Sequence, residues 1–378
     1  MNEQAMTRLW RQVGGFVLLA LFLLLGGLMF AHRVWAGNAP WVWVVGAALA
    51  SGYFLFGLWR GLPQNRRAGS LDLLPTLGWG NGLTMVRSLM LAMLFGFLFV
   101  PRPEGWANWL PGLLYLLAAL PDYLDGYLAR ITNHVTELGG DLDMRADSVG
   151  VFTATTLAVL YGILPWWYWP IGLARYLFLF GIFIRERRGL RIYEMPDSVR
   201  RRGFAALKMG FMFVVLFPPF RPPGTYVAAV VFGIPFALGF LLDWGYVAGL
   251  VTPEQVRKLD GWKQAIIDWV PVGLRIAAIA LLVPVVTDYF SRGGAWVGLG
   301  WLGVVATFFL VLGVAGHTSA MLAVIVIGYA QMLAPLSPAE LVLIAVYIGM
   351  IFLGSGRFSL WPIEDRLIYH RIGDSPAA

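Results

Sequence analysis

The sequence predicts an all-α integral membrane protein with about twelve transmembrane helices. Of its 378 residues, 59% are hydrophobic and only 13% are charged, which is far from the composition of soluble globular domains. The apolar residues gather in segments of the length that crosses a bilayer. These segments are residues 13–31, 41–59, 83–100, 109–120, 149–164, 166–184, 209–217, 226–250, 270–286, 295–316, 319–333 and 341–353.

The basic residues predict the orientation of these helices. If the amino terminus lies in the cytosol, most arginines and lysines fall in cytosolic loops, and only Arg33, Arg102, Arg221 and Arg292 fall in the opposite loops. Cytosolic loops of membrane proteins carry the excess of Lys and Arg. We therefore expect a multi-pass protein of the cytoplasmic cell membrane whose segment around residue 130 faces the cytosol.

Several classes of protein are excluded by what the chain lacks. It has no cysteine, so disulfides, thiolate metal ligands and cysteine nucleophiles are excluded. No basic run with interleaved aromatic residues indicates a nucleic-acid partner. The first apolar segment is followed by His32, Arg33 and a second span, so no cleavable signal peptide is expected.

Charged residues are concentrated in residues 122–147, where a membrane protein should carry few of them. Residues at i, i+3, i+4, i+7 and i+8 of a helix share one face, and two consecutive helices would each carry such a face. These residues are Asp122, Asp125, Gly126, Ala129 and Arg130 on the first helix, and Gly139, Asp143 and Asp147 on the second. A turn around residues 133–136 would bring the two faces, and their aspartates, together.

Carboxylates this close repel one another unless cations lie between them. Neither helix face carries a histidine, so the ligands are oxygen atoms, which suit Mg²⁺ or Mn²⁺ rather than zinc. One or two such ions fit the cluster, and we expect two. The small residues would let a ligand approach the backbone, and Arg130 can hold a phosphate in a bidentate fork. The stretch is therefore interpreted as a site for metal ions and a pyrophosphate.

The spacing Asp-x-x-Asp-Gly-x-x-Ala-Arg, followed after eight residues by Gly-x-x-x-Asp-x-x-x-Asp, resembles the signature of the CDP-alcohol phosphotransferase family at every specified position. The resemblance covers residues 71–250 and implies a six-helix catalytic core, with the motif between its second and third helices. It implies a transferase of phospholipid biosynthesis. Such an enzyme moves a substituted phosphate, such as the phosphatidyl group of CDP-diacylglycerol, to the hydroxyl of a polar acceptor and releases CMP.

The resemblance also implies roles for individual residues. Metal ions would be bound by Asp122, Asp125, Asp143 and Asp147. Asp147 would also be the general base that deprotonates the acceptor. The nucleotide would be bound at Asp125, Gly126, Ala129, Arg130, Gly139 and Asp143. The implied partners are a CDP-alcohol lipid donor, an alcohol acceptor and membrane lipid. The sequence leaves open a homodimer, the donor tail and the acceptor, which could be glycerol 3-phosphate, an inositol phosphate, serine or another polar alcohol.

Two further basic features belong to this core. Arg87 follows Asn81, Leu83 and Thr84, which resemble the family's first core helix, and it either snorkels to the headgroups or takes part in the site. Residues 185–210 form the most basic segment of the chain. Its arginines fit a solvated cytosolic loop, and some of them would bind a phosphorylated acceptor. The candidates for that role are Arg185, Arg188, Arg191, Arg202 and Lys208.

The chain divides into residues 1–70 with two leading helices, the core at 71–250, and 251–378 with four trailing helices. Capping boxes at residues 252–255 and 337–340 predict helix starts, the first of them a surface helix that acts as a linker. Residues 265–370 resemble the DoxX-like four-helix membrane family through Arg275 and residues 354–360. Trp361 stands where that family has an aspartate, and Arg275 is either a structural residue of the bundle or a functional one.

Three other interpretations compete with the enzyme. An ordinary polar loop between two membrane helices would carry charges without the fixed spacing. A cation transporter would spread its carboxylates through the depth of the bilayer, whereas these aspartates cluster at one helix junction. A membrane subunit of a redox complex, suggested by the trailing helices, would leave residues 122–147 unexplained. The enzyme is the interpretation that accounts for the motif.

Overall fold

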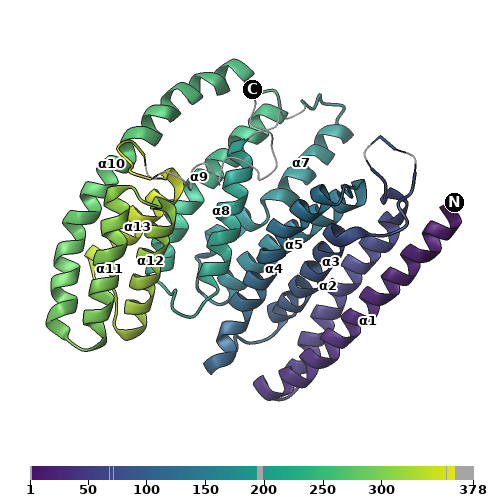
Figure 1. The fold of residues 1–378 in the computed structure, drawn as a ribbon, viewed down its shortest axis with the longest axis horizontal. Helices are drawn as coiled ribbons and strands as arrows, with labels where there is room; N and C mark the ends of the chain where they lie inside the picture. Colours follow the sequence, from purple (N-terminus) through teal and green to yellow (C-terminus); the bar gives the residue numbers. More distant parts are fainter. Residues whose placement is uncertain (1, 68, 71, 194–198, 355, 362–378) are drawn as a thin grey trace. The chain divides into compact units, whose positions relative to one another are not determined.

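The computed structural model of the chain is built of helices, without a β-strand, over the residues that it describes: 2–67, 69–70, 72–193, 199–354 and 356–361 (Figure 1). The α-helices are α1 (Asn2–Val34), α2 (Ala39–Gly61), α3 (Gly78–Gly96), α4 (Leu110–Ile131), α5 (Glu137–Leu160), α6 (Trp169–Gly172), α7 (Ala174–Arg187), α8 (Val199–Val215), α9 (Gly224–Val247), α10 (Pro253–Arg292), α11 (Ala295–Leu312), α12 (Gly316–Leu333) and α13 (Pro338–Leu353). Short 3₁₀ turns are η1 (Leu62–Gln64), η2 (Phe97–Phe99), η3 (Gly105–Trp109) and η4 (Trp166–Tyr168).

Each of the apolar segments found in the sequence lies on one of these helices or on a turn that adjoins it. Among the described residues, seven helices are long and apolar enough to cross a membrane, or eight if the bent pair of η4–α6 and α7 is one span. The remaining α-helices are shorter, except α4 and α5, which carry the aspartates of the motif. Large apolar side chains are exposed along these helices, as on α1 at Leu18, Phe22 and Met29, where lipid would cover them. The protein is a multi-pass membrane protein, and the total of about twelve crossing helices stays a prediction.

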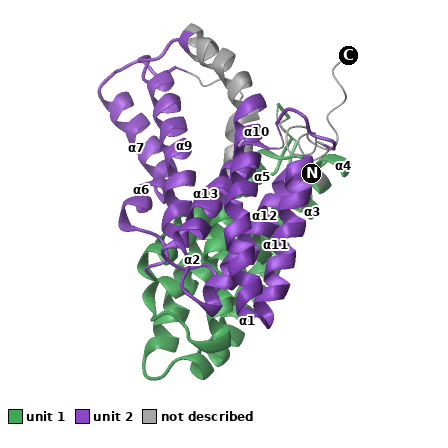
Figure 2. Ribbon diagram, turned by 90° about the vertical axis from the view of Figure 1, so that its left-hand side faces the viewer, with its two compact units in different colours: residues 1–161, 211–218 green, residues 162–210, 219–378 purple. Residues whose placement is uncertain are grey.

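The structure divides into two compact units, which Figure 2 colours separately. The first unit comprises Met1–Tyr161 and Phe211–Pro218, and the second comprises Gly162–Gly210 and Pro219–Ala378. In the first unit, α3 packs against α2, α4 and α5, and α1 packs against α2. Helix α3 is therefore the central helix of this unit, and most of its side chains are buried.

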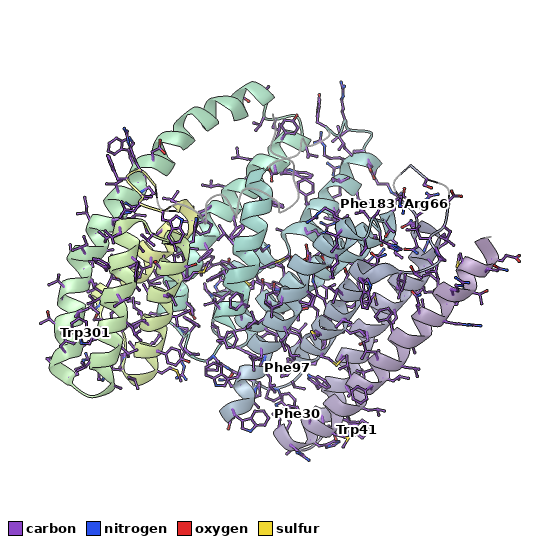
Figure 3. The ribbon with its side chains drawn as sticks, in the orientation of Figure 1. Phe30, Trp41, Arg66, Phe97, Phe183 and Trp301 are labelled. Carbon is purple, nitrogen blue, oxygen red and sulfur yellow. The ribbon has the colours of Figure 1, made fainter. Side chains whose placement is uncertain are left out.

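Aromatic residues gather at one end of the first unit. The ring of Phe97 contacts Trp35 at 5.5 Å and Trp43 at 6.0 Å, and Phe30 contacts Trp106 at 5.4 Å between ring centroids. Figure 3 shows Phe30 and Phe97 at this end and Arg66 at the other. Tryptophan prefers the interface between membrane and water. Arg66 lies at the opposite end, where it pairs with Glu137 at the start of α5.

In the second unit, α10, α11, α12 and α13 form a bundle in which each helix packs against the next and α13 closes against α10. Both predicted capping boxes are confirmed, at Thr252 with Gln255 and at Ser337 with Glu340. Arg275 donates to the hydroxyl of Ser359 at 3.0 Å, so the two parts of the DoxX-like resemblance contact each other. That resemblance itself stays a prediction.

The expected surface helix after residue 252 is wrong as a separate element. Helix α10 runs without a break for 40 residues from Pro253 to Arg292, or about 60 Å at 1.5 Å per residue. Its part from Asp268 onward is the membrane-span candidate. A capping box marks where a helix begins but not where it ends, and α10 continues through Pro271, which lies near the start of its apolar part.

The trailing helices also pack against α9, which the sequence assigns to the core. The ring of Phe352 on α13 lies 4.6 Å from that of Phe232 and 6.3 Å from that of Phe236. Gln331 donates to the carbonyl oxygens of Arg221 and Pro222 just before α9. The division at residue 250 stays a prediction, and a chain that ended there would lose these contacts.

We expect Phe352→Ala to lower the thermal unfolding temperature measured in detergent. The lost ring contacts should cost about 1–3 kcal/mol, less than a fully buried phenylalanine, because Phe352 is half-buried. The matched control is Phe308→Ala, since Phe308 is 57% exposed. An equal decrease in both variants would contradict a stabilising α9–α13 interface.

Candidate metal and phosphate site

The turn between α4 and α5 brings the two motif faces together, as the sequence predicts. Helix α4 ends at Ile131 and α5 begins at Glu137. Asn133 reverses the chain with a left-handed φ of 51°, a conformation that Asn adopts more readily than most residues. Thr136 caps α5 by accepting a hydrogen bond from the backbone N–H of Gly139 at 3.0 Å. This cap fixes the start of the helix that carries Asp143 and Asp147.

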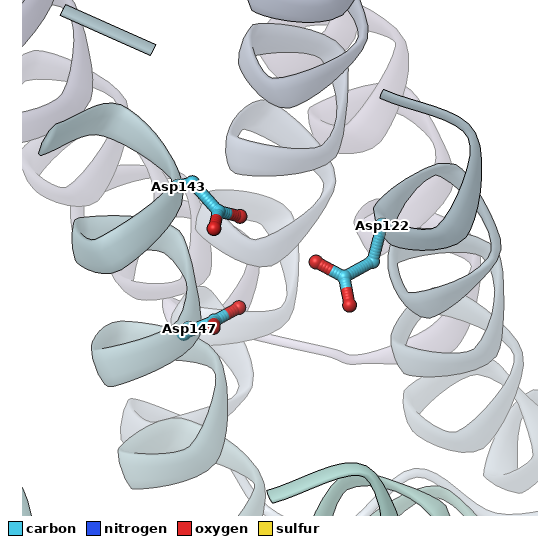
Figure 4. Close-up of side chains that lie close together, drawn as sticks. All are labelled: Asp122, Asp143 and Asp147. Carbon is cyan, nitrogen blue, oxygen red and sulfur yellow. The ribbon is translucent and has the colours of Figure 1, made fainter. Parts of the chain in front are cut away.

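Three of the predicted metal ligands lie together. Asp122 projects from α4 towards Asp143 and Asp147 on α5 (Figure 4), and one carboxylate oxygen of each lies within 4.8 Å of the others. The spacing of four residues between Asp143 and Asp147 places both on the same side of α5. This is an all-oxygen ligand set of the kind that Mg²⁺ and Mn²⁺ prefer, so these residues fit a divalent cation.

Asp125 lies beside this triad but has other partners. It is 7% exposed, and its carboxylate accepts hydrogen bonds from the hydroxyl of Thr84 at 2.8 Å and from the backbone N–H of Gly126 at 2.5 Å. Both of its oxygens are therefore engaged. Asp125 could still reach the metal site, because its carboxylate lies 3.7 Å from the guanidinium that contacts the triad.

That guanidinium belongs to Arg87, for which the sequence left two interpretations: snorkelling to the headgroups or taking part in the site. Arg87 does not snorkel: its side chain is 3% exposed and lies among the aspartates. Nη1 contacts Asp122 and donates to Asp143 at 2.9 Å, and Nη2 contacts Asp147. Arg87 thus belongs to the site as the cation that faces every aspartate of the motif.

The small residues of the motif have packing neighbours. A Cβ added at Gly80 of α3 would lie 2.9 Å from the Cβ of Ala129, so these two residues let α3 and α4 approach closely. At Gly139, an added Cβ would collide with the side-chain oxygen of Asn81. Arg130 is exposed, and its guanidinium lies near Gly126. The nucleotide-binding roles of these positions stay predictions.

Residues that the sequence did not indicate hold the α4–α5 turn from outside. Arg67 donates from Nε and Nη2 to the carbonyl of Asn133 at 3.2 and 3.0 Å, and Arg66 pairs with Glu137 at 3.0 Å. His134 shares a hydrogen bond with the carbonyl of Thr76 at 2.9 Å. The segment between α2 and α3 therefore supports the turn that carries the motif.

The predicted acceptor residues lie in the second unit. Arg185 donates to the carbonyls of Arg191 and Ala248 at 2.7 and 3.1 Å, and Lys208 donates to the carbonyl of Ile171 at 2.6 Å. Arg188 is exposed, and Arg191 lies over the ring of Tyr193. The side chain of Arg202 lies outside the described residues. Arg185 and Lys208 thus have structural partners, whereas Arg188 and Arg191 present their charges to solvent.

Comparison with known proteins agrees with the motif. A sequence model of the CDP-alcohol phosphatidyltransferase family matches residues 79–241. A cardiolipin synthase (CMP-forming) of Streptomyces coelicolor is 33% identical over 162 residues, which cover 42% of this chain and 71% of that enzyme. The chain belongs to the CDP-alcohol phosphatidyltransferase family. The matched region contains Arg87 and all of the motif aspartates.

Other relatives in the family match shorter regions. A CDP-diacylglycerol–glycerol-3-phosphate 3-phosphatidyltransferase of Cereibacter sphaeroides is 36% identical over 96 residues, covering 25% of this chain and 42% of that enzyme. A putative cardiolipin synthase of Mycobacterium bovis is 30% identical over 84 residues, covering 22% of this chain and 40% of that protein. The chain thus spans less than half of the length of these two relatives. No solved structure matches the chain significantly.

We expect Thr136→Ala to destabilise the protein by about 1–2 kcal/mol, because it removes the helix cap of α5 and the acceptor for the Asn81 amide at 3.0 Å. Thr136→Ser should restore most of the loss, since its hydroxyl can cap in the same way. Thermal unfolding of the purified variants measures the effect. The control is Thr132→Ala, an exposed threonine whose hydroxyl donates to the carbonyl of Leu128 on the preceding helix. A Thr136→Ala variant as stable as this control would contradict the capping role.

Proposed function

We propose that the protein transfers the phosphatidyl group of CDP-diacylglycerol, or the corresponding group of a related CDP-alcohol, to the hydroxyl of a polar alcohol and releases CMP. The observation that carries this proposal is the triad of Asp122, Asp143 and Asp147, with oxygens within 4.8 Å of one another, inside the region that matches the family. Membership of the family supports the class of donor and acceptor.

The aspartates have distinct tasks in this reaction. Asp122, Asp143 and Asp147 would hold Mg²⁺ or Mn²⁺, with Asp125 beside them, and we infer two ions. Bound metal ions neutralise the diphosphate and stabilise CMP as a leaving group. Asp125 is held in place by Thr84, so it can orient the nucleotide on the face of α4. Gly126, Ala129, Arg130 and Gly139 would line the same nucleotide site, with Arg130 donating to a phosphate.

Asp147 is the proton acceptor in the proposed reaction. The acceptor oxygen attacks the phosphorus of the phosphatidyl group, the bond from that phosphorus to CMP breaks, and the hydroxyl proton moves to the Asp147 carboxylate. Asp147 lies one helical turn beyond Asp143 on α5 and is partly exposed, with a side-chain exposure of 36%. An acceptor can therefore reach it. We further propose that the site faces the cytosol, because the basic residues favour that orientation.

The proposed function is tested with the purified full-length protein, CDP-diacylglycerol, Mg²⁺ or Mn²⁺ and single acceptors. The acceptors are glycerol 3-phosphate, an inositol phosphate, serine and phosphatidylglycerol, since relatives act in glycerophosphate transfer and cardiolipin synthesis. Mass spectrometry of CMP and of the lipid product gives the result. We expect CMP release that depends on both metal and one acceptor, and failure with all of these acceptors would reject the proposal.

Asp147→Asn should fold normally but lose turnover. The amide is nearly isosteric with the carboxylate but cannot take a proton, and general-base catalysis contributes about 10²–10⁴-fold. The measurement is kcat for CMP release at saturating metal. A loss of less than about tenfold would reject the assignment of Asp147 as the base.

Asp122→Ala and Asp143→Ala should weaken metal binding, because each removes one ligand from the shared site. We expect the Mn²⁺ concentration for half-maximal activity to rise by about tenfold or more, as for loss of an interaction near 1.4 kcal/mol. Asp141→Ala is the matched control, since Asp141 pairs with Arg145 at 2.7 Å outside the triad. Unchanged metal dependence in both triad variants, or full activity in EDTA, would contradict the metal site.

The basic segment predicts a phosphorylated acceptor. Arg188 and Arg191 are its exposed candidates, so the double variant with glutamine at both positions should raise the KM of glycerol 3-phosphate while leaving the KM of CDP-diacylglycerol unchanged. Loss of one charge-assisted hydrogen bond is worth about tenfold or more. The control is the double variant with glutamine at the exposed Arg8 and Arg11. Arg67 is not used as a control because it holds the α4–α5 turn. Preference for serine over every phosphorylated acceptor would reject this proposal.

A further inference from the structure

The carboxylates of the metal site already hold a cation that belongs to the chain. The Arg87 guanidinium contacts Asp122, Asp143 and Asp147, the same three residues whose oxygens could share a metal ion. Arg87 contacts the Oδ1 atom of each of these three aspartates. A divalent cation that binds these carboxylates would therefore compete with Arg87 for them.

Exposure shows from which side an ion can enter. The Arg87 side chain is 3% exposed, whereas the side chains of Asp122, Asp143 and Asp147 are 28%, 46% and 36% exposed. The guanidinium thus lies on the buried side of the cluster and the carboxylates open towards the surface. An ion can reach the carboxylates without crossing the protein interior.

The charges of the cluster explain why Arg87 and a divalent cation would alternate as partners of the aspartates. One guanidinium balances only one of the four aspartates, and like charges within about 4 Å repel by about 1 kcal/mol in water and more in a protein. A buried arginine, in turn, needs a carboxylate partner. Arg87 and a divalent cation therefore stabilise the same carboxylates in two alternative ways.

We propose that Arg87 is an exchangeable counter-ion of the metal site. It neutralises the aspartates when no metal is bound, and a divalent cation takes over its carboxylate oxygens on binding. This inference rests on the metal site of the proposed function, but it concerns stability and metal affinity rather than turnover. It makes Arg87 a residue that sets how tightly the site binds metal.

The test uses Mn²⁺ alone, with no CDP-alcohol present. Thermal unfolding of the full-length protein is followed in EDTA and over a Mn²⁺ titration for wild type, Arg87→Met, Arg87→Lys and the control Arg145→Met. Arg145 has a carboxylate partner, Asp141, on the same helix as Asp143 and Asp147 but contacts none of the triad. The control therefore removes an arginine ion pair without changing the site.

Arg87→Met should unfold at a lower temperature than wild type in EDTA, and saturating Mn²⁺ should reduce that difference. Its half-saturating Mn²⁺ concentration should be about tenfold below that of wild type, because the competing charge is gone. Arg87→Lys should fall between the two, and Arg145→Met should match wild type. A half-saturating concentration in Arg87→Met that is less than about threefold below wild type, or above it, would overturn the proposal.

The test gives a result even if Arg87→Met folds poorly. If Arg87→Met can be purified only in Mn²⁺ and unfolds on chelation while wild type and Arg145→Met do not, the exchange is supported. If it cannot be purified at all, Arg87→Lys decides, and a half-saturating Mn²⁺ concentration in Arg87→Lys at or above that of wild type would overturn the proposal. A wild-type protein that binds Mn²⁺ but releases no CMP would reject the proposed function and leave this inference standing, so the two failures are distinguishable.

Discussion

Repulsion between the carboxylates of Asp122, Asp143 and Asp147 is the constraint on which the first unit depends. Their oxygens lie within 4.8 Å of one another, a separation that is unfavourable unless positive charge lies between them. The surrounding structure has to hold two helices together against this repulsion. It does so with a capped helix start, a left-handed turn residue and a guanidinium placed among the acids. The same unbalanced charge would favour the divalent cations that we propose for this site.

Helix α3 connects these elements although it carries none of the motif aspartates. On successive turns, Asn81 donates to Thr136, Thr84 donates to Asp125 and Arg87 contacts the triad. The cap of α5, the orientation of Asp125 and the charge balance therefore all depend on one helix face. The segment before α3 extends this support, because Arg66 and Arg67 hold the turn between α4 and α5.

The sequence predicted the part of the site that depends on local periodicity. Asp143 and Asp147 are one turn apart on one helix, so their common face follows from helix geometry alone. The turn at residues 133–136 and both capping boxes were also predicted, because each depends on residues that are close together in the sequence. The four acids, with no histidine on their two helix faces, also indicated hard cations.

What the sequence could not predict depends on contacts between distant segments. A lone arginine in an apolar run can snorkel or pair, and only the packing of α3 against α4 and α5 places Arg87 among the acids. The bonds from Arg67 to Asn133 join residues 66 positions apart. The continuity of α10 was missed because hydropathy changes along that helix while its backbone does not.

The most direct measurement for this account is an experimental structure of the protein with Mn²⁺ and CDP, read by the anomalous scattering of manganese. The account predicts at least one manganese peak within about 2.0–2.3 Å of carboxylate oxygens of Asp122, Asp143 and Asp147, with the Arg87 guanidinium withdrawn from those oxygens. A structure with saturating Mn²⁺ and CDP in which manganese binds elsewhere, and Arg87 still bridges the three aspartates, would contradict it.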